Sequence, residues 1–366
     1  MNQSGTLFAA QALRVSRTGT RHRQRRVVCS LAAVLRHNNI KCRAIARPMG
    51  GVMPVCRSAD TMDDLLRHAI GAVRSEGTGN QASRGETIEV VGAVLELRNP
   101  RARLSRTEKR RRESAAVAEL SWYLRGTNDG EAIAFWIPKY RDEFEDDGTV
   151  HGGYGPRLFG DGADAQILNI VSMLRDNPST RRAVVQIFDR RDVTGGYRYK
   201  DVPCTTTLQF LLRKDGLTLI ANMRSNDVYM GLPLDVFSFT MLQELVARDL
   251  GVDMGPYVHS VGSLHLYTRN LPDVDQFLAE GWQSTDSPMP PMPAGSQWDN
   301  VRALLAAEEQ LRIGLPLEEV TMPTEPYWGD LVRVLAHRLA VRAGNAVLAE
   351  SVAQAIHHPA FADFIT

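Results

Sequence analysis

Hydrophobic positions alternate along two neighbouring stretches near the middle of the chain. The segments TTTLQFLL and LTLIANM read as strands, and a turn over residues 214–216 (Lys-Asp-Gly) joins them. Two alternating segments that flank a short glycine-containing turn are typical of an antiparallel hairpin. The hairpin is expected to bring Cys204, at its start, and Arg224, at its end, to the same region.

Helical and strand periodicities alternate along much of the remaining sequence. Helices are predicted over residues 61–75, 107–124, 163–178 and 236–251, and strands over residues 88–97, 181–189 and 255–267. A proline- and methionine-rich linker, DSPMPPMPAGS, then precedes about seventy residues of helical pattern. The chain therefore divides into an N-terminal extension (1–52), a central domain (53–285) and a linker with a helical C-terminal extension (286–366).

Composition separates the central domain from the N-terminal extension. No run approaches the roughly 18 to 20 apolar residues that a membrane span requires. The formal net charge is +1, yet residues 1–52 hold nine arginines, one lysine and no acidic residue. An organelle transit peptide, a nucleic-acid-binding arm or a start codon placed too early would each give such a segment. We favour a disordered or non-native, dispensable segment, and expect neither a membrane nor nucleic acid as a partner.

The cysteines form no recognisable framework. They are Cys29, Cys42, Cys56 and Cys204, without a C-x-x-C pair. We therefore expect neither disulfides nor a metal site, and a cytoplasmic location. Cys204 is a candidate nucleophile, because a nearby guanidinium group favours the thiolate. A cysteine in an apolar strand can equally be a small buried hydrophobic residue, so the strand alone leaves both interpretations open.

The wider sequence favours the nucleophile. The strings PCTTTLQF, MRSNDVYMGLPLDVFSF and VHSVGSLHLY resemble, in order and spacing, three motifs of the thymidylate synthase family. These motifs are its nucleophile strand, its Arg-Ser-x-Asp stretch and its His-x-Tyr pair, and the resemblance covers roughly residues 62–270. It implies an α+β fold with a mixed central β-sheet flanked by helices, here with an added helical C-terminal segment. It also implies an obligate homodimer.

The same resemblance implies a one-carbon transfer to C5 of a pyrimidine nucleoside monophosphate, with 5,10-methylenetetrahydrofolate as co-substrate and no metal. Cys204 would add to C6 of the ring, leaving C5 carbanion-like and able to attack the one-carbon unit. Glu119, in the string AELSWYL, would carry out proton transfers together with ordered water. The alternative for Glu119 is a place on a solvated helix face. Hydride transfer would complete a methyl group, and attack by water a hydroxymethyl group.

Further residues match substrate-binding positions of the family. Guanidinium groups fit phosphate bidentately, and the second subunit would supply the pair Arg181 and Arg182. His265 and Tyr267 would contact the sugar hydroxyl. The remaining assignments are Arg84, Arg224 and Ser225 for the phosphate and Gln209 for the base pocket. Arg84 lies in a shortened loop, so an ordinary exposed arginine is an equal alternative.

The folate side of the site departs from the family pattern. Tyr140 stands where tryptophan is usual and Leu234 where phenylalanine is usual, while Asp227 and Gly231 match positions near the folate. Together with the altered C-terminus, these changes suggest a pocket that admits water and favour a hydroxymethyl product.

Base choice depends on Asp235, where thymidylate synthases have asparagine. The amide matches N3-H and O4 of uracil, whereas a carboxylate accepts from the amino group of cytosine and can share a proton with N3. A carboxylate would also leave uracil O4 without a donor. Thr205 replaces a histidine of the network around O4, and both changes resemble the cytidylate hydroxymethylases of this superfamily. A helix N-cap is the alternative role for Asp235.

The preferred interpretation is a cytidylate 5-hydroxymethyltransferase acting on dCMP or CMP, since both nucleotides fit the sequence. A thymidylate synthase that methylates dUMP and tolerates Asp235 is the first alternative. A non-catalytic relative that binds nucleotides is the second, and intact Cys204, Glu119 and Arg224 argue against it.

Overall fold

The computed structural model describes residues 54–105, 113–160, 165–194, 198–282 and 288–365. The predicted N-terminal extension and the first part of the helix predicted over 107–124 lie outside these ranges. Within them, no helix is long and apolar enough to cross a membrane.

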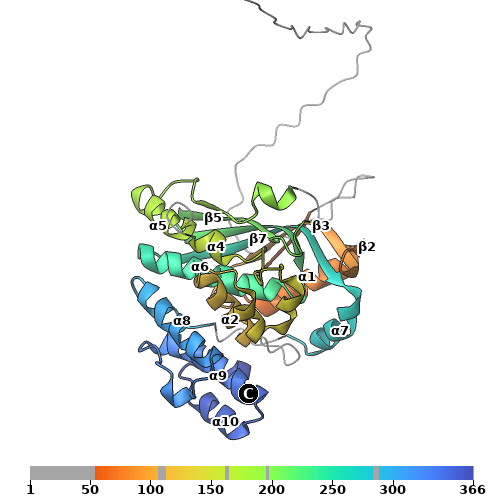
Figure 1. Cartoon of the computed structure of the whole chain (residues 1–366). Helices are drawn as coiled ribbons and strands as arrows, with labels where there is room; N and C mark the ends of the chain where they lie inside the picture. Colours follow the sequence, from red (N-terminus) through yellow and green to blue (C-terminus); the bar gives the residue numbers. More distant parts are fainter. Residues whose placement is uncertain (1–53, 106–112, 161–164, 195–197, 283–287, 366) are drawn as a thin grey trace, which may run out of the picture. The chain divides into compact units, whose positions relative to one another are not determined.

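A mixed seven-stranded sheet forms the centre of the described fold (Figure 1). The strands lie in the order β1-β3-β7-β6-β5-β4, and β2 pairs with β3 off this path. Their bounds are Val55–Ala59 (β1), Thr78–Ala82 (β2), Gly85–Leu97 (β3), Val184–Gln186 (β4), Thr205–Arg213 (β5), Gly216–Asp227 (β6) and Met254–Tyr267 (β7). The pairs β1–β3 and β6–β7 are parallel and the others are antiparallel, so the predicted mixed sheet is confirmed.

The predicted hairpin is present as β5 and β6. Its turn requires Gly216, which has a φ of 102° and whose added Cβ would lie 2.6 Å from the carbonyl oxygen of Asp253. Strand β6 then pairs in parallel with β7, which places Asp227 opposite His265. The three stretches that carry the candidate residues therefore lie on adjacent strands.

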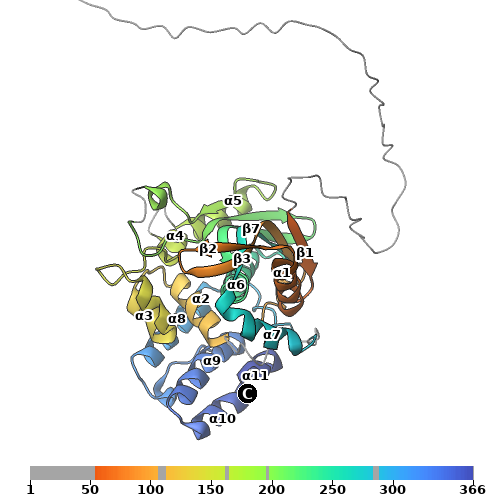
Figure 2. The same ribbon diagram turned by 90° about the vertical axis from the view of Figure 1, so that its right-hand side faces the viewer.

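Helices α1 and α6 pack against the sheet, and α2 packs on α6 (Figures 1 and 2). Thr61 caps α1 by accepting from the backbone N–H of Asp64 at 3.2 Å, and α6 ends at the left-handed Gly251. The helices before the C-terminal extension are Met62–Glu76 (α1), Glu113–Leu124 (α2), Gly130–Trp136 (α3), Gly155–Phe159 (α4), Gln166–Asp176 (α5), Leu232–Leu250 (α6) and Leu271–Ala279 (α7). Short 3-10 turns cover Pro138–Glu143 (η1), Arg190–Val193 (η3), Thr268–Asn270 (η4) and Leu317–Glu319 (η5).

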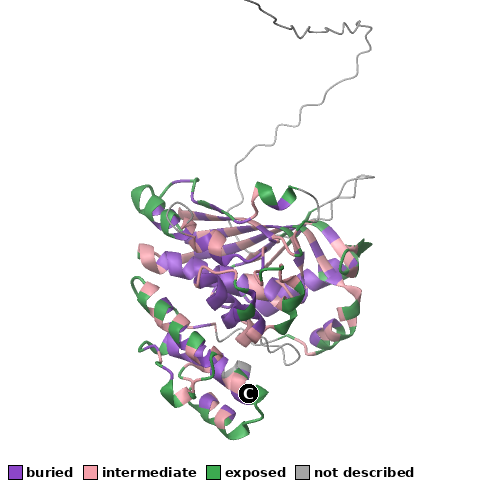
Figure 3. Ribbon diagram, in the orientation of Figure 1, coloured by how far each residue is buried: buried purple, intermediate pink, exposed green. Residues whose placement is uncertain are grey.

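The predicted helical C-terminal extension forms α8 (Trp298–Arg312), α9 (Pro326–Arg342), α10 (Ala346–Gln354) and α11 (Pro359–Ile365). Helices α8 and α9 pack against α2, and their buried side chains continue the core of the sheet domain (Figure 3). Glu308 of α8 accepts from Arg125 Nη2 at 2.6 Å and from Trp136 Nε1 at 2.7 Å. The extension therefore supports the helix that carries Glu119.

Candidate active site

The start of β5 and the end of β6 hold Cys204 and Arg224 together, as the hairpin predicts. The backbone N–H of Arg224 donates to the carbonyl oxygen of Cys204 at 2.9 Å. Its guanidinium group donates to the carbonyl oxygens of Pro203 at 2.9 Å and Val202 at 3.1 Å. Arg224 thus fixes the backbone that presents the thiol, while its side chain stays exposed to solvent and can meet a ligand.

Burial raises the pKa of the Cys204 thiol to about 11. Arg224 opposes this rise, whereas the carboxyl groups of Asp201 and Asp235 add to it. The ligand-free thiol is therefore protonated at neutral pH. The guanidinium groups of Arg224 and Arg84 both act in favour of the thiolate, but desolvation outweighs their attraction in the ligand-free state.

Glu119 is a buried carboxyl group on α2, which excludes the solvated helix face. Burial raises its pKa, and hydrogen bonds from Tyr140 and Tyr123 act in the opposite direction. The Tyr140 hydroxyl donates to Glu119 Oε1. A buried carboxyl group that has a raised pKa and accepts hydrogen bonds from phenols is suited to accept and return a proton.

Asp235 lies in the first turn of α6, where the N-cap residue is Gly231. An N-cap role for Asp235 is therefore wrong. Its Oδ2 instead accepts from Asn226 Nδ2 at 2.7 Å. Burial, followed by the charge of Glu119, raises the pKa of Asp235 well above its ordinary value. The charge of Glu119 thus acts on Asp235, and the charge of Asp235 acts in turn on Cys204.

Thr205, which follows Cys204 in the sequence, is fully buried. Its hydroxyl donates to the Tyr154 hydroxyl at 3.0 Å, and its backbone N–H donates to the same oxygen at 3.2 Å. Burial and then the charge of Asp235 raise the pKa of Tyr154. Thr205, which stands where the family has histidine, therefore forms a hydrogen bond to Tyr154. The charge of Asp235 acts on the same phenol.

Arg84 lies at the mouth of the site between two carboxylates. Its Nη2 donates to Glu143 Oε2 at 2.7 Å and lies 3.4 Å from Asp201 Oδ1. Arg269 supports it by donating to the Arg84 carbonyl oxygen at 2.7 Å while lying 4.0 Å from the ring centroid of Tyr267. The charge of Arg84 also acts to lower the pKa of Cys204, and its assignment to the phosphate stays a prediction.

The sugar and phosphate candidates line the β6–β7 pair. Ser225 Oγ lies 3.4 Å from His265 Nδ1, and the His265 ring meets Tyr267 edge to face at 5.2 Å. Asp227 Oδ1 accepts from the backbone N–H groups of Tyr229 and Met230 at 2.9 and 3.1 Å. Asp227 therefore holds the turn that leads into α6.

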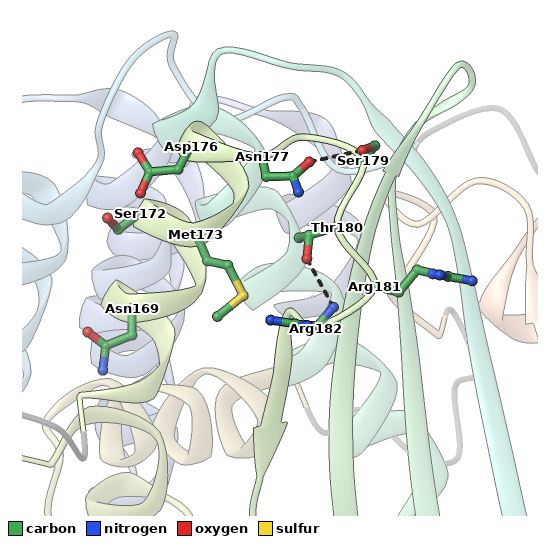
Figure 4. A pocket seen from close by; sticks show the side chains of 9 residues that line it. All are labelled: Asn169, Ser172, Met173, Asp176, Asn177, Ser179, Thr180, Arg181 and Arg182. Carbon is green, nitrogen blue, oxygen red and sulfur yellow. Dashed lines mark hydrogen bonds between the residues drawn. The ribbon is translucent and has the colours of Figure 1, made fainter.

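Arg181 and Arg182 lie elsewhere, at a cavity of about 830 Å³ beside α5 (Figure 4). In this view Arg182 turns toward α5 and Arg181 points the opposite way across the strands (Figure 4). The cavity is lined by Asn169, Ser172, Met173, Asp176, Asn177, Ser179, Thr180, Arg181 and Arg182. The structure does not bring this pair together with Cys204 within the subunit.

Gln209, which the resemblance assigns to the base pocket, lies beside Arg181 in this subunit, and its role in base binding stays a prediction. Its side-chain amide donates to the Arg181 carbonyl oxygen at 3.0 Å. A register shift between Thr205 and Thr207 switches the faces of β5, so Leu208 and Phe210 are buried and Gln209 points to the opposite side. Uninterrupted alternation would have placed Gln209 on the same face as Thr205.

The residues predicted to lie near the folate come from η1, the end of β6 and the start of α6. Tyr140 and Leu234 are partly buried and pack against the core. A Cβ on Gly231 would lie 3.1 Å from Asn226 Nδ2 and 3.6 Å from Asp235 Oδ2, so Gly231 borders the Asn226–Asp235 pair directly.

The sequence interpretation missed several polar residues of the site: Asp201, Asn226, Tyr257 and His259. The latter three form hydrogen bonds that lead to Asp235. The available signal was a polar residue at alternate, inward-facing positions of otherwise apolar strands. In the described segments, no group of three or more His, Cys, Asp or Glu side chains is arranged to hold a metal ion.

Comparisons with known proteins agree with this arrangement. Residues 63–295 match the family model described as thymidylate synthase. A thymidylate synthase from Bacillus licheniformis is 29% identical over 178 residues, which are 46% of this chain and 62% of that protein. The chain thus spans less than two thirds of the length of this curated relative. The thermostable thymidylate synthase A from Bacillus subtilis has the same fold, with a TM-score of 0.51, 23% identity and coverage of 61% of this chain and 86% of that chain. The family match covers well over half of the sequence, and the chain belongs to the thymidylate synthase family.

Proposed function

We propose that this protein transfers a one-carbon unit from 5,10-methylenetetrahydrofolate to C5 of a cytidine monophosphate, dCMP or CMP, and that water addition gives 5-hydroxymethylcytidylate. The observation that carries this proposal is the carboxyl group of Asp235 in the cluster of Cys204 and Glu119.

Asp235 is suited to cytosine by its hydrogen-bonding capacity. A protonated carboxyl group offers one donor to N3 and one acceptor to the 4-amino group, and its raised pKa favours that protonated form. An ionised carboxylate paired with N3-protonated cytosine is the equivalent arrangement. Uracil presents O4 in place of the amino group, so an acceptor would face an acceptor, which is costly in a buried site.

Cys204 is the nucleophile in this proposal. Its sulfur forms a bond to C6 while the C5–C6 π electrons move toward C5, and the thiol proton must leave as the bond forms. Because burial holds the thiol protonated, its proton must pass to solvent as the bond to C6 forms, and protonation of the base by Asp235 makes C6 more electrophilic. Glu119, positioned by Tyr140, takes the proton that C5 must lose.

The residues on the folate side fit the co-substrate. Asp227 offers a carboxylate suited to N–H donors, Tyr140 and Leu234 offer aromatic and apolar surface, and Gly231 lies close to Asn226 and Asp235. When bound, methylenetetrahydrofolate supplies the one-carbon unit at the formaldehyde oxidation level. The phenol of Tyr140 carries a polar hydroxyl into a place where the family usually has indole, which supports entry of water and a hydroxymethyl product.

A homodimer is part of the same proposal. Val91 and Val94 of β3 and Val184 of β4 expose 56%, 37% and 40% of their surface, which leaves apolar side chains on the sheet face away from α6. Arg181 lies on the same edge of the sheet as β4. A second copy packed on this face would cover the valines and bring Arg181 and Arg182 to the phosphate site of its partner.

Tritium release from C5 of labelled dCMP, CMP and dUMP, with methylenetetrahydrofolate present, tests the proposal. Release from a cytidylate, with 5-hydroxymethylcytidylate identified by mass spectrometry, is expected. Release from dUMP alone would instead identify a thymidylate synthase. Nucleotide binding with no release from any of the three would indicate a non-catalytic relative.

Two variants accompany the assay. Cys204→Ala is expected to abolish release while retaining nucleotide binding. Asp235→Asn is expected to gain activity toward dUMP, because an amide matches uracil. An unchanged base preference in Asp235→Asn would remove Asp235 from base recognition.

A further inference from the structure

A chain of hydrogen bonds runs through the core from β7 to Asp235. The Tyr257 hydroxyl lies 2.6 Å from His259 Nδ1, and His259 Nε2 lies 3.1 Å from Asn226 Oδ1. Asn226 Nδ2 then donates to Asp235 Oδ2 at 2.7 Å. Tyr257 and His259 have no exposed surface and Asn226 is 4% exposed, so water does not compete for these bonds.

The chemistry of the groups fixes the direction of each bond. Asn226 uses its amide N–H toward Asp235, so its Oδ1 is the acceptor and His259 Nε2 must carry a hydrogen. Burial lowers the pKa of His259 to about 3, so the ring is neutral and its Nδ1 is an acceptor. Nδ1 therefore accepts from the Tyr257 hydroxyl. In each of the three hydrogen bonds, the donor is the group farther from Asp235 along the series.

The hydrogen bond donated by Asn226 makes the two oxygens of the Asp235 carboxyl group inequivalent. A neutral carboxyl group that is free to exchange its donor and acceptor oxygens could match either cytosine or uracil. The N–H of Asn226 occupies Oδ2 as an acceptor, which makes Oδ2 the carbonyl oxygen and leaves the proton on Oδ1. The carboxyl group then presents a donor and an acceptor in one fixed order.

We propose that Tyr257, His259 and Asn226 are positioning residues for base selection, because they fix which oxygen of Asp235 carries the proton. This inference rests on the proposed function. Oδ1–H donates to N3 of cytosine, and the second lone pair of Oδ2 accepts from the 4-amino group. Uracil would require the reverse order, which costs the bond from Asn226.

The polar side chains that form this series of hydrogen bonds support a role beyond packing. A phenol, an imidazole and an amide all lose hydration when they are buried, and apolar side chains would fill these positions of β6 and β7 without that cost. Gly231 also leaves room beside the pair, since a Cβ there would crowd Asn226 Nδ2 at 3.1 Å. The buried polar groups therefore lie where they can set the orientation of Asp235.

The first test uses the unmodified protein and needs no turnover. Nitrogen-15 NMR of labelled histidine, with the His259 signal identified by its loss in His259→Gln, is expected to show a neutral ring with hydrogen on Nε2. A hydrogen on Nδ1, or a charged ring at neutral pH, would overturn the inference.

The second test compares two substitutions at one position. His259→Gln keeps an N–H donor for Asn226 and an acceptor for Tyr257, whereas His259→Leu keeps volume and loses both. Relative kcat/KM for cytidylate and dUMP should stay near the wild-type ratio in His259→Gln and shift toward dUMP at least about tenfold in His259→Leu. Tyr257→Phe should lie between them, because the ring can then exchange tautomers.

Controls separate this inference from folding and from the proposed function. Binding of ribose 5-phosphate or deoxyribose 5-phosphate, which lack a base, should be unchanged in both His259 variants. Equal ratios in His259→Leu and His259→Gln would overturn the inference even if the wild type is a cytidylate enzyme. A wild type active only on dUMP would overturn the proposed function, while the NMR result would still report whether the bonds run toward Asp235.

Discussion

The Tyr140 hydroxyl donates a hydrogen bond to Oε1 of Glu119, so a residue assigned by sequence to the folate pocket also contacts the proposed general base. The two side chains come from η1 and α2, which are separated in sequence but adjacent in space. Tyr140 therefore links the folate side of the site to proton transfer.

Tyr140→Phe is expected to lower the rate of tritium release roughly 10- to 100-fold, the usual contribution of a hydrogen bond to a charged group. The Tyr140 bond lowers the pKa of Glu119 against the opposing effect of burial. Its loss should raise that pKa and move the rising limb of the pH–rate profile to higher pH, because the base must be ionised. Tyr327→Phe, which removes a hydroxyl near Met241 in the C-terminal core, is the matched control and should leave the profile unchanged.

The reactivity of Cys204 gives a second prediction. With a pKa of about 11, about one thiol in a thousand is ionised at pH 8, so alkylation by iodoacetamide should be slow and should accelerate up to high pH. Asp201→Asn should speed alkylation, because it removes a charge that raises the pKa, and Arg224→Leu should slow it. Mass spectrometry of the Cys204 peptide separates this signal from exposed Cys56. Changes of the same sign in both variants would contradict the electrostatic account.

The raised pKa of Asp235 predicts a pH-dependent effect on stability. The folded protein keeps this proton at pH values where the unfolded chain, with a pKa near 3.9, has lost it, so the group costs stability as pH rises above about 4. Asp235→Asn avoids this cost and still accepts from Asn226. Its gain in Tm over wild type should be smallest near pH 4 and reach on the order of 2 °C at neutral pH. Thermal unfolding across this range measures the difference.

Asp147→Asn provides a control of opposite sign for that experiment. Hydrogen bonds from Thr149 lower the pKa of Asp147, so its contribution is present above the unfolded pKa and is lost as pH falls. Asp147→Asn should therefore be less stable than wild type at neutral pH, with a difference that shrinks toward acid. A gain for Asp235→Asn that does not vary with pH would show that titration is not its cause.

The contact between the C-terminal extension and α2 predicts a third stability effect. Glu308 accepts from Arg125 and Trp136 and is almost fully buried. Glu308→Leu should therefore lower the free energy of unfolding by about 2 kcal/mol. The loss is smaller than for breaking a fully buried ion pair, because Arg125 is partly exposed. Glu309→Leu removes a solvent-exposed partner of the same arginine and should cost less than about 1 kcal/mol. Denaturant unfolding measures both values, and similar losses would show that Glu308 is not a docking contact.

Shared sites in a homodimer predict recovery of activity from two inactive variants. Cys204→Ala lacks the nucleophile, and the double variant Arg181→Ala with Arg182→Ala lacks the proposed phosphate contacts. After equal amounts are unfolded together and refolded, half of the dimers are mixed and one of their two sites is complete, so activity should return to about a quarter of wild type. No recovery would show that each subunit holds its own phosphate without Arg181 and Arg182 of its partner.

The sequence by itself determined the features that depend on neighbouring residues. Alternation and a glycine turn predicted the hairpin of β5 and β6, and hence the meeting of Cys204 and Arg224. Helical spacing predicted α6 and the C-terminal helices. These features follow from local periodicity, which the chain carries wherever it lies in the fold.

Only the tertiary structure decided which polar groups meet. The irregularity at the start of β5 decides which residues of that strand are buried, because one extra residue reverses the faces that alternation predicts. The bonds from His259 to Asn226 and from Asn226 to Asp235 join β7, β6 and α6, and no pattern within one element reports a partner in another. Burial, which sets the protonation of Cys204 and Asp235, likewise exists only once the elements have packed together.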